Sequence, residues 1–427
     1  MTTGTEHLRP RFQTVVMLLL GLSWCTLISV GAVALLGLLF AAILAPIAFR
    51  GTIRQPHPIA IAFLILNIGY FGYFAVAGPL HSPIADYSDS LWRLAPMPVI
   101  GVLVFFLTPN QPHALTLTGR MTPWLWLGTA LSTVVLIILA AFDDDRRANT
   151  LHGNPLLVSN ALFIGGLLPL TLWHRAHWWG KLALSCLSLA TLIALTIWAE
   201  ARAHSIFMLA LGGGIWAALC LGTIDGRHRW LWRLSLCGSA AIAAVALVYW
   251  LLVVWDHAIA VRIQNGLSTV VAIFQGDATG VLDTSFEQRA IMWQAGWNAF
   301  FEQPLWGYGI QNRFTATDLP FSYTHLHNSL LTHLVAGGLA GALLYASLIL
   351  FAPFAWTYLR IARPAYWHSL DKPQRQELLW LGVIATLCPI LSGLTNVVMF
   401  ESTLLALSLL PISFWVMMLP PIEQHLQ

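Results

Sequence analysis

The chain has 427 residues, of which 58% are hydrophobic and only 9% are charged, with a formal net charge of +3 and a mean hydropathy of +0.72. This composition excludes a soluble globular domain, because apolar runs of about 20 residues, each long enough to cross a bilayer, follow one another along most of the sequence. All five cysteines fall inside apolar runs without disulfide or zinc spacing, so we interpret them as small core residues.

The apolar runs predict an all-α polytopic membrane protein with about 12 transmembrane helices. The first run has no Ala-x-Ala cleavage signal and is interpreted as a retained span. In chain order the predicted spans are 13–30, 32–49, 58–79, 95–108, 122–141, 155–173, 179–199, 206–223, 231–256, 328–358, 377–396 and 400–419. They divide the chain into helices one to nine (1–256), one large loop (257–327) and helices ten to twelve (328–427).

The distribution of charge predicts the orientation. If both termini are cytoplasmic, 14 of the 21 Lys and Arg residues fall on the cytoplasmic side, and 13 of the 18 Asp and Glu residues fall on the other side. An excess of Lys and Arg in cytoplasmic loops is the usual pattern of helical membrane proteins. The large loop 257–327 is therefore expected on the outer side.

The large loop is the only predicted loop that is long enough to fold. Its first part, 258–274, has polar and apolar residues at helical spacing, which is typical of a helix lying at the membrane interface. A second helix is predicted from about Thr284 to Phe301, with a capping residue at its start. The glycine-rich sequence Pro304-Leu-Trp-Gly-Tyr-Gly309 is expected to end it in a turn.

Three histidines stand at the start of the next apolar run, in Tyr323-Thr-His-Leu-His-Asn-Ser-Leu-Leu-Thr-His333. An imidazole titrates near neutral pH, so it can accept a proton or hydrogen-bond a phosphate. Zinc binding by His325-x-His327 is an alternative, but no nearby Cys or Glu completes such a site, and we expect neither a metal nor another cofactor. A histidine cluster at the interface without a role is a further alternative.

Every basic residue on the predicted outer side is arginine. Its planar fork binds phosphate through two hydrogen bonds, whereas lysine acts as a point charge. Arg289 shares a predicted helix face with Trp293. Arg202 follows the seventh span, Arg147 follows the fifth span, and Arg313 lies late in the loop. Packing against neighbouring aromatic or acidic side chains is the alternative explanation. The preferred interpretation is a site for an anionic, phosphate-bearing substrate linked to lipid.

Together these features resemble the bacterial O-antigen ligases and their relatives, the oligosaccharide polymerases and protein O-oligosaccharyltransferases, in topology over nearly the whole chain. The motifs that carry the resemblance are Arg146-Arg-Ala-Asn-Thr-Leu-His-Gly-Asn-Pro155, Glu200-Ala-Arg202, Arg289-Ala-Ile-Met-Trp293 through Pro304-Leu-Trp-Gly-Tyr-Gly309, His325-Leu-His327-Asn328 and Gly337-Gly338-Leu-Ala-Gly341. The family's Ser-Arg-Gly reads Ala201-Arg202-Ala203 here, so Arg202 and His204 both remain candidates for that arginine position.

The resemblance implies a GT-C-like glycosyltransferase of a bacterial inner membrane with its active site on the periplasmic face. The donor would be a glycan on undecaprenyl pyrophosphate, the acceptor a hydroxyl group of lipid A–core, and the transfer inverting and metal-independent. His327 matches the catalytic position of the family. Arg202 and Arg289 would bind the pyrophosphate, with His325, Arg147 and Arg313 as further contacts. The implied partners are the lipid-linked donor, the lipid A–core acceptor and the bilayer, and no nucleic acid is expected.

Two alternatives of the same chemistry stay open, namely an O-antigen polymerase and a protein O-oligosaccharyltransferase. A membrane transporter is the alternative from a different class, and about 12 spans would suit it. Against a transporter, the halves of the chain show no internal repeat and no pair of spans broken by Gly or Pro. The polar residues also gather on one predicted side, which favours an enzyme with one accessible face.

Overall fold

A computed structural model of the chain describes the residues on which the fold and the site are built. These are residues 31–49, 56–77, 91–108, 129–139, 141–142, 155–174, 176–197, 208–215, 284–312, 326–394 and 402–419, with the isolated residues 13, 15, 16, 19, 80, 218, 268 and 400.

Every regular element within these ranges is a helix, which confirms the predicted all-α class. The labelled helices are α2 (Gly31–Phe49), α3 (Pro58–Ala77), α5 (Pro96–Leu107), α7 (Pro155–Leu167), the 3-10 helix η2 (Leu168–His174), α8 (Trp178–Ile197), the short π-helix η3 (Met208–Gly212), α13 (Thr284–Glu302), α14 (Gly309–Asn312), α15 (Ser329–Ile349), α16 (Phe351–Ala362), α17 (Pro364–Ser369), α18 (Lys372–Gly393) and α19 (Ser402–Met417). Residues 129–139 are helical as well.

Four of the described helices are long and apolar enough to cross a membrane, by length and composition: Pro58–Ala77, Trp178–Leu195, Ser329–Ile349 and Gln374–Gly393. Shorter apolar helices occur at Ala34–Phe49, Pro96–Leu107, Thr129–Leu139, Leu157–Thr171 and Leu404–Met417. Each of these nine lies within or overlaps a predicted span. Span 231–256, most of span 13–30 and half of span 206–223 lie outside the described residues, so the count of about 12 and the large outer loop remain predictions, as does the interfacial helix 258–274.

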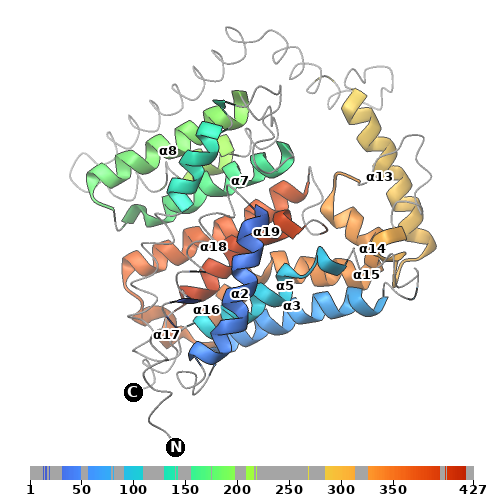
Figure 1. Cartoon of the computed structure of the whole chain (residues 1–427), viewed down its shortest axis with the longest axis horizontal. Coiled ribbons are helices and arrows are strands. Elements are labelled where there is room, and N and C mark those ends of the chain that lie inside the picture. The colour runs from blue at the N-terminus through green and yellow to red at the C-terminus, as the bar shows by residue number, and fades with distance from the viewer. Residues whose placement is uncertain are drawn as a thin grey trace, which may run out of the picture.

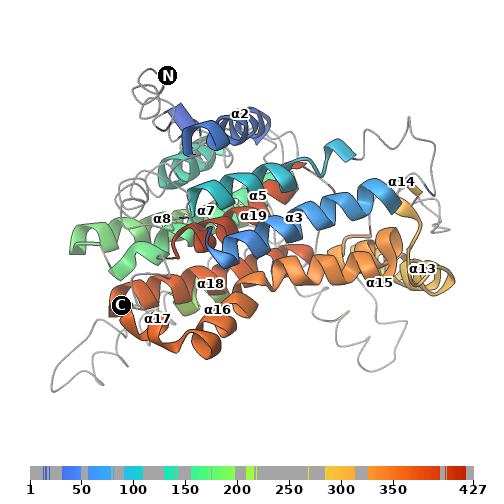
Figure 2. The same cartoon turned by 90° about the horizontal axis from the view of Figure 1, so that it is seen from below.

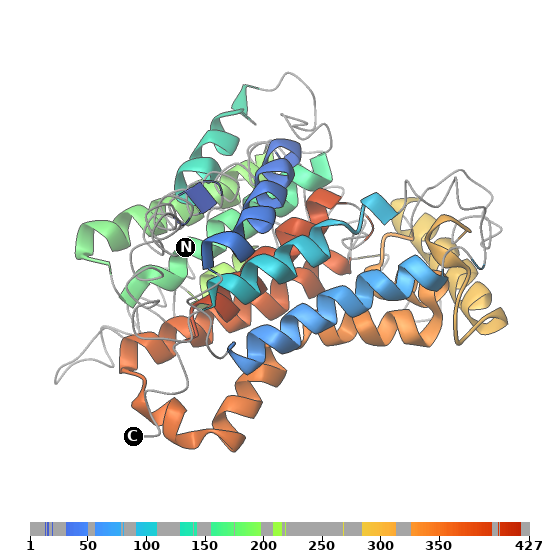
Figure 3. The ribbon, with the colours of Figure 1, turned by 60° about the horizontal axis from the view of Figure 1, so that its bottom comes forward.

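The helices form one bundle whose two ends differ. Figures 1 and 2 both place α13 and α14 at one end and α16 and α17 at the other, while α3 and α15 run side by side along the bundle. Figure 3 shows the same arrangement from a third direction, with α7 and α8 on the side away from α3. The α13 end is the one that the charge distribution predicts to be outside.

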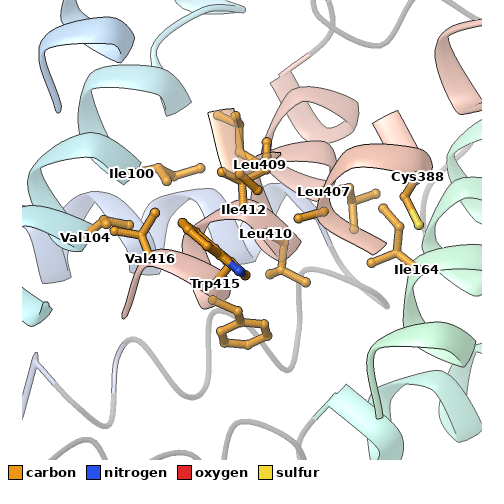
Figure 4. Close-up of a cluster of buried hydrophobic side chains, with 14 of the residues drawn as sticks. Ile100, Val104, Ile164, Cys388, Leu407, Leu409, Leu410, Ile412, Trp415 and Val416 are labelled. Carbon is orange, nitrogen blue, oxygen red and sulfur yellow. The ribbon is translucent and has the colours of Figure 1, made fainter. Parts of the chain in front are cut away.

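Helix α19 lies in the middle of the core. Its described side chains from Leu404 to Met417 are all buried, as expected for a helix that is apolar on every face. Figure 4 shows Ile100 and Val104 of α5 on one side of this helix, and Cys388 of α18 and Ile164 of α7 on the other. The core therefore joins helices from both halves of the chain.

Small residues allow the helices to approach one another closely, as is common between membrane helices. A Cβ atom on Gly101 of α5 would lie 3.2 Å from side-chain carbons of Asn67 and Leu64 of α3. On the other side of the core, a Cβ atom on Gly382 of α18 would lie 3.1 Å from the indole nitrogen of Trp415. These contacts hold α18 in the core and hold α3, against which the candidate site is built.

Candidate functional site

Helix α15 is broken in its middle, which corrects the prediction of one long span over 328–358. Gly338 has φ 57° and ψ −158°, outside the helical region. A straight helix would place residues 333 and 345 about 18 Å apart along its axis, yet the rings of His333 and Tyr345 stack with their centroids 4.1 Å apart. The first piece of the helix, 329–337, therefore folds back alongside the second piece, 339–349.

The second piece continues into α16. The amide of Leu350 donates to the carbonyl of Ala346 at 2.9 Å, and the amide of Phe354 donates to the carbonyl of Leu350 at 3.1 Å. The backbone thus remains hydrogen-bonded across the boundary between the two helices. The long apolar run that begins at 328 therefore contains a short folded-back helix, 329–337, followed by the helical segments 339–349 and 351–362.

The glycine-rich turn 304–309 packs against the break and satisfies its backbone. The amide of Tyr308 donates to the carbonyl of Val335 at 2.9 Å, and the amide of Leu339 donates to the carbonyl of Pro304 at 2.7 Å. From α3, the hydroxyl of Tyr73 donates to the carbonyl of Gly337 at 2.6 Å. Polar backbone groups freed by a broken helix at membrane depth need such partners, because lipid supplies none.

Glycine is required on both sides of this contact. Gly307 and Gly338 both have positive φ, at 66° and 57°. A Cβ atom on Gly307 would lie 2.5 Å from the amide nitrogen of Gly338, and one on Gly338 would lie 2.6 Å from the amide nitrogen of Trp306. Two backbones therefore meet where no side chain fits, which gives a physical reason for the Gly residues in both sequence motifs.

Helix α13 holds the segment that leads into the folded-back helix. The helix spans Thr284–Glu302, close to the predicted bounds. The indole N–H of Trp293 donates to the carbonyl of Leu326 at 3.0 Å. One turn further, a Cβ atom on Gly296 would lie 2.9 Å from side-chain carbons of Leu326 and Leu331, so α13 lies directly against this segment.

His327 follows Leu326 and begins the turn into the folded-back helix. It is the one described residue other than glycine with a positive φ, 48°, and its side chain is half-buried. Histidine is among the residues that adopt this left-handed region more readily than most, and such residues cluster at functional sites. The backbone here turns sharply from the contact with α13 into the helix.

Asn328 caps the folded-back helix. Its side-chain oxygen accepts from the amide of Leu331 at 3.0 Å, and its backbone is extended, with φ −151° and ψ 114°. The carbonyl of Asn328 also accepts from the hydroxyl of Thr332 at 2.7 Å. His327 therefore stands immediately before the first turn of a helix, where the partial positive charge of the helix favours a nearby anion.

Arg289 lies on α13 one turn before Trp293. Residues four apart on a helix are neighbours on one face, and Trp293 is the residue that contacts the carbonyl preceding His327. The side chain of Arg289 is half-buried and makes further interactions. The structure thus brings Arg289 and His327, which are 38 positions apart in the sequence, to the same end of the bundle on two elements in direct contact.

The remaining predicted site residues, Arg202, Arg147, Arg313 and His325, lie outside the described residues, as does His204. Their roles stay predictions.

The structure adds two residues that sequence reasoning did not assign to the site. His333 is fully buried and contacts Tyr70 of α3 through its Nε2 atom. His333 belongs to the same histidine-rich stretch, but apolar neighbours made it look like an ordinary residue of a span. The signal that identifies it is a titratable side chain inside an apolar run, which marks a functional position by default in a membrane protein.

Tyr308, in the glycine-rich turn, is linked to the end of α13. Its hydroxyl donates to a carboxylate oxygen of Glu302 at 2.7 Å. Desolvation by its surroundings, with a smaller contribution from Glu302, raises the pKa of Tyr308 to about 12. The phenol therefore stays protonated at physiological pH and keeps the turn joined to α13.

These features define the class of protein: a polytopic α-helical membrane protein with a candidate site at one end of its bundle. Residues 187–346 match the family model described as O-antigen ligase. This match supports the family that the motifs resemble, and the matched segment includes α13, the glycine-rich turn and the folded-back helix. The match supports a transferase of the O-antigen ligase or polymerase type. Comparison with curated proteins gives no match.

Proposed function

We propose that this protein is an O-antigen ligase. It would transfer a glycan from undecaprenyl pyrophosphate to a hydroxyl group of lipid A–core at the periplasmic face of a bacterial inner membrane, with both of its termini in the cytoplasm. The match of residues 187–346 to the O-antigen ligase family supports this class of reaction. The observation that carries the site is the contact between α13 and the carbonyl before His327, because it joins a candidate phosphate ligand to a candidate base.

In the proposed reaction the acceptor hydroxyl oxygen attacks the anomeric carbon of the donor sugar. The bond from that carbon to the pyrophosphate oxygen breaks, and its electron pair leaves with undecaprenyl pyrophosphate. His327 takes the proton of the attacking hydroxyl, and one displacement at the anomeric carbon inverts its configuration. A positioned general base contributes roughly 10²–10⁴-fold to a rate.

The leaving group gains negative charge as the bond breaks, so fixed positive groups beside it lower the barrier. Arg289 and Arg202 are proposed to hold the pyrophosphate, with Arg147, Arg313 and His325 as further contacts. Guanidinium groups bind phosphate oxygens through two parallel hydrogen bonds. The start of the helix capped by Asn328 favours an anion at the same place. We therefore propose a reaction that needs no metal ion.

Purified protein, undecaprenyl-pyrophosphate glycan and lipid A–core, mixed with and without EDTA, test the proposal directly. We expect transfer to be unaffected by EDTA, to fall at least about 100-fold in His327→Ala and to fall strongly in Arg289→Ala. Arg289→Lys should restore only part of the loss, because lysine lacks the planar fork. Full activity of His327→Ala would refute the role of this imidazole.

Matched controls come from the opposite end of the bundle. His368 of α17 and Arg360 of α16 are exposed there, and their alanine variants are expected to transfer at the normal rate. A polymerase is distinguished by the product in a deletion strain. Unattached lipid-linked polymer with a bare core indicates a ligase, whereas a core that carries a single repeat unit indicates a polymerase.

A further inference from the structure

His333 is held on both ring nitrogens inside the bundle. Its Nδ1 atom lies 2.5 Å from the carbonyl oxygen of Ser329, one turn earlier in the folded-back helix. Its Nε2 atom lies 2.5 Å from the hydroxyl of Tyr70 in α3. The imidazole is fully buried. A buried polar group of this kind is retained only where its hydrogen bonds are made.

The partners determine where the protons lie. A carbonyl oxygen can only accept, so Nδ1 carries a hydrogen and donates it to Ser329. A neutral ring with its hydrogen on Nδ1 accepts at Nε2, and in that tautomer the hydroxyl of Tyr70 is the donor. The ring also stacks on Tyr345 at 4.1 Å and on Phe400 at 4.6 Å.

The two hydrogen bonds connect the start of the folded-back helix to a long membrane helix. Ser329 is the first residue of the folded-back helix and follows the Asn328 cap directly. Tyr70 belongs to α3, which packs along the bundle. The side chain of Tyr70 is fully buried. His333 therefore links the start of the folded-back helix to α3, in addition to the hydrogen bond from Tyr73 of α3 to the carbonyl of Gly337.

We propose that His333 is a positioning residue that acts through this link. Together with Tyr70 it fixes the folded-back helix 329–337 on α3, and so sets the position of His327 at the start of that helix. The contact of α13 with Leu326 holds the same turn from the other side. The catalytic meaning of this position rests on the proposed role of His327.

Tyr70→Phe is the mildest test, because it removes one hydroxyl and preserves the ring that packs against Phe74. We expect kcat for glycan transfer to fall about 10- to 100-fold, the range that a displacement near 1 Å produces, while KM for the donor changes less than about twofold. His333→Phe keeps an aromatic ring between Tyr345 and Phe400 and removes both hydrogen bonds. It should lower kcat by at least as much.

The double variant shows whether the two residues act as one unit. Tyr70→Phe combined with His333→Phe should lower kcat no further than His333→Phe alone, since contacting residues that share one interaction are not additive. Tyr358→Phe, at an exposed tyrosine of α16, is the matched control and should leave kcat unchanged. Where His327→Ala is inactive, normal kcat in Tyr70→Phe, or multiplied losses in the double variant, would overturn the proposal.

A second measurement does not depend on activity. Diethyl pyrocarbonate modifies accessible imidazoles, and peptide mass spectrometry reports the rate at each histidine. In Tyr70→Phe we expect faster modification of His327 and of His333, and an unchanged rate at His368. If His327→Ala keeps full activity but these rates rise, the positioning stands and the proposed reaction role fails. If His327→Ala is inactive and the rates stay normal, the positioning is refuted and the reaction role remains.

Discussion

Replacing Gly338 by alanine tests the broken helix most directly. The combination of φ 57° and ψ −158° belongs to a region that is almost confined to glycine, and a side chain there costs roughly 1–3 kcal/mol. The new Cβ atom would also lie 2.6 Å from the amide nitrogen of Trp306, which forces the glycine-rich turn away from the break. The two backbone hydrogen bonds between turn and helix would then be lost, at roughly 0.5–1.5 kcal/mol each.

Together these effects amount to roughly 2–6 kcal/mol, which is a large part of the roughly 5–15 kcal/mol by which a folded domain is typically stable. We therefore expect Gly338→Ala to unfold at a clearly lower temperature, measured by tryptophan fluorescence of detergent-purified protein, and to lose most glycan transfer. The loss of transfer follows because the break places the folded-back helix, and His327 with it, against α13.

Gly72→Ala is the matched control for this experiment. Gly72 lies in α3, and a Cβ atom there would meet no atom within 4 Å. Alanine is favoured over glycine inside a helix by roughly 0.5–1 kcal/mol, so this variant should be as stable as the parent or slightly more stable. The reasoning is refuted if Gly338→Ala and Gly72→Ala unfold at the same temperature and transfer at the same rate.

Two further predictions concern α13 and the turn that follows it. Trp293→Phe keeps a ring but removes the hydrogen-bond donor to the carbonyl of Leu326. It should lower the free energy of unfolding by about 1 kcal/mol. It should also lower kcat more than the control Trp297→Phe, a change one turn away at a side chain that is 45% exposed. Equal losses in both variants would contradict a specific role for the hydrogen bond. Tyr308→Phe tests the pH dependence of the hydrogen bond to Glu302. The pKa of the Tyr308 phenol is raised to about 12 in the folded protein. The stabilisation by this hydrogen bond is therefore present below about pH 10 and is lost as the pH rises through 12. The difference in Tm between parent and variant should stay constant from pH 6 to 9 and shrink above 10; a difference that shrinks between pH 6 and 9 would contradict this assignment.

Helix α13 shows what local sequence information can predict. Its start followed from capping residues before an amphipathic stretch, and its end followed from the glycine-rich sequence at Pro304. The structure places it at Thr284–Glu302, within a residue of the predicted bounds. Most predicted spans among the described residues also coincide with apolar helices, because the need to satisfy backbone hydrogen bonds in lipid leaves a long apolar run few other choices.

The break in α15 could not be predicted from the same signals. The run from Ser329 to Ile349 is apolar and helical on both sides of Gly338, and small residues in such a run are equally typical of close helix packing. The break becomes visible only when the run is paired with the turn 304–309, some 30 positions earlier. Likewise, the partner of His333 is Tyr70, which is 263 positions away in the sequence. Local periodicity carries no information about such pairs.

The folded-back helix also explains why the motif residues are arranged as they are. A single straight helix from Ser329 to Ile349 would be about 30 Å long, and it would carry His333 about 18 Å from Tyr345 instead of onto its ring. With the break, the capped N-terminus of a short helix is held between α13 and α3. The positive end of that helix, the imidazole of His327 and the helix that carries Arg289 then meet at one end of the bundle. An anionic leaving group and a proton acceptor are both required by the proposed transfer, and one glycine-dependent break supplies the geometry for both.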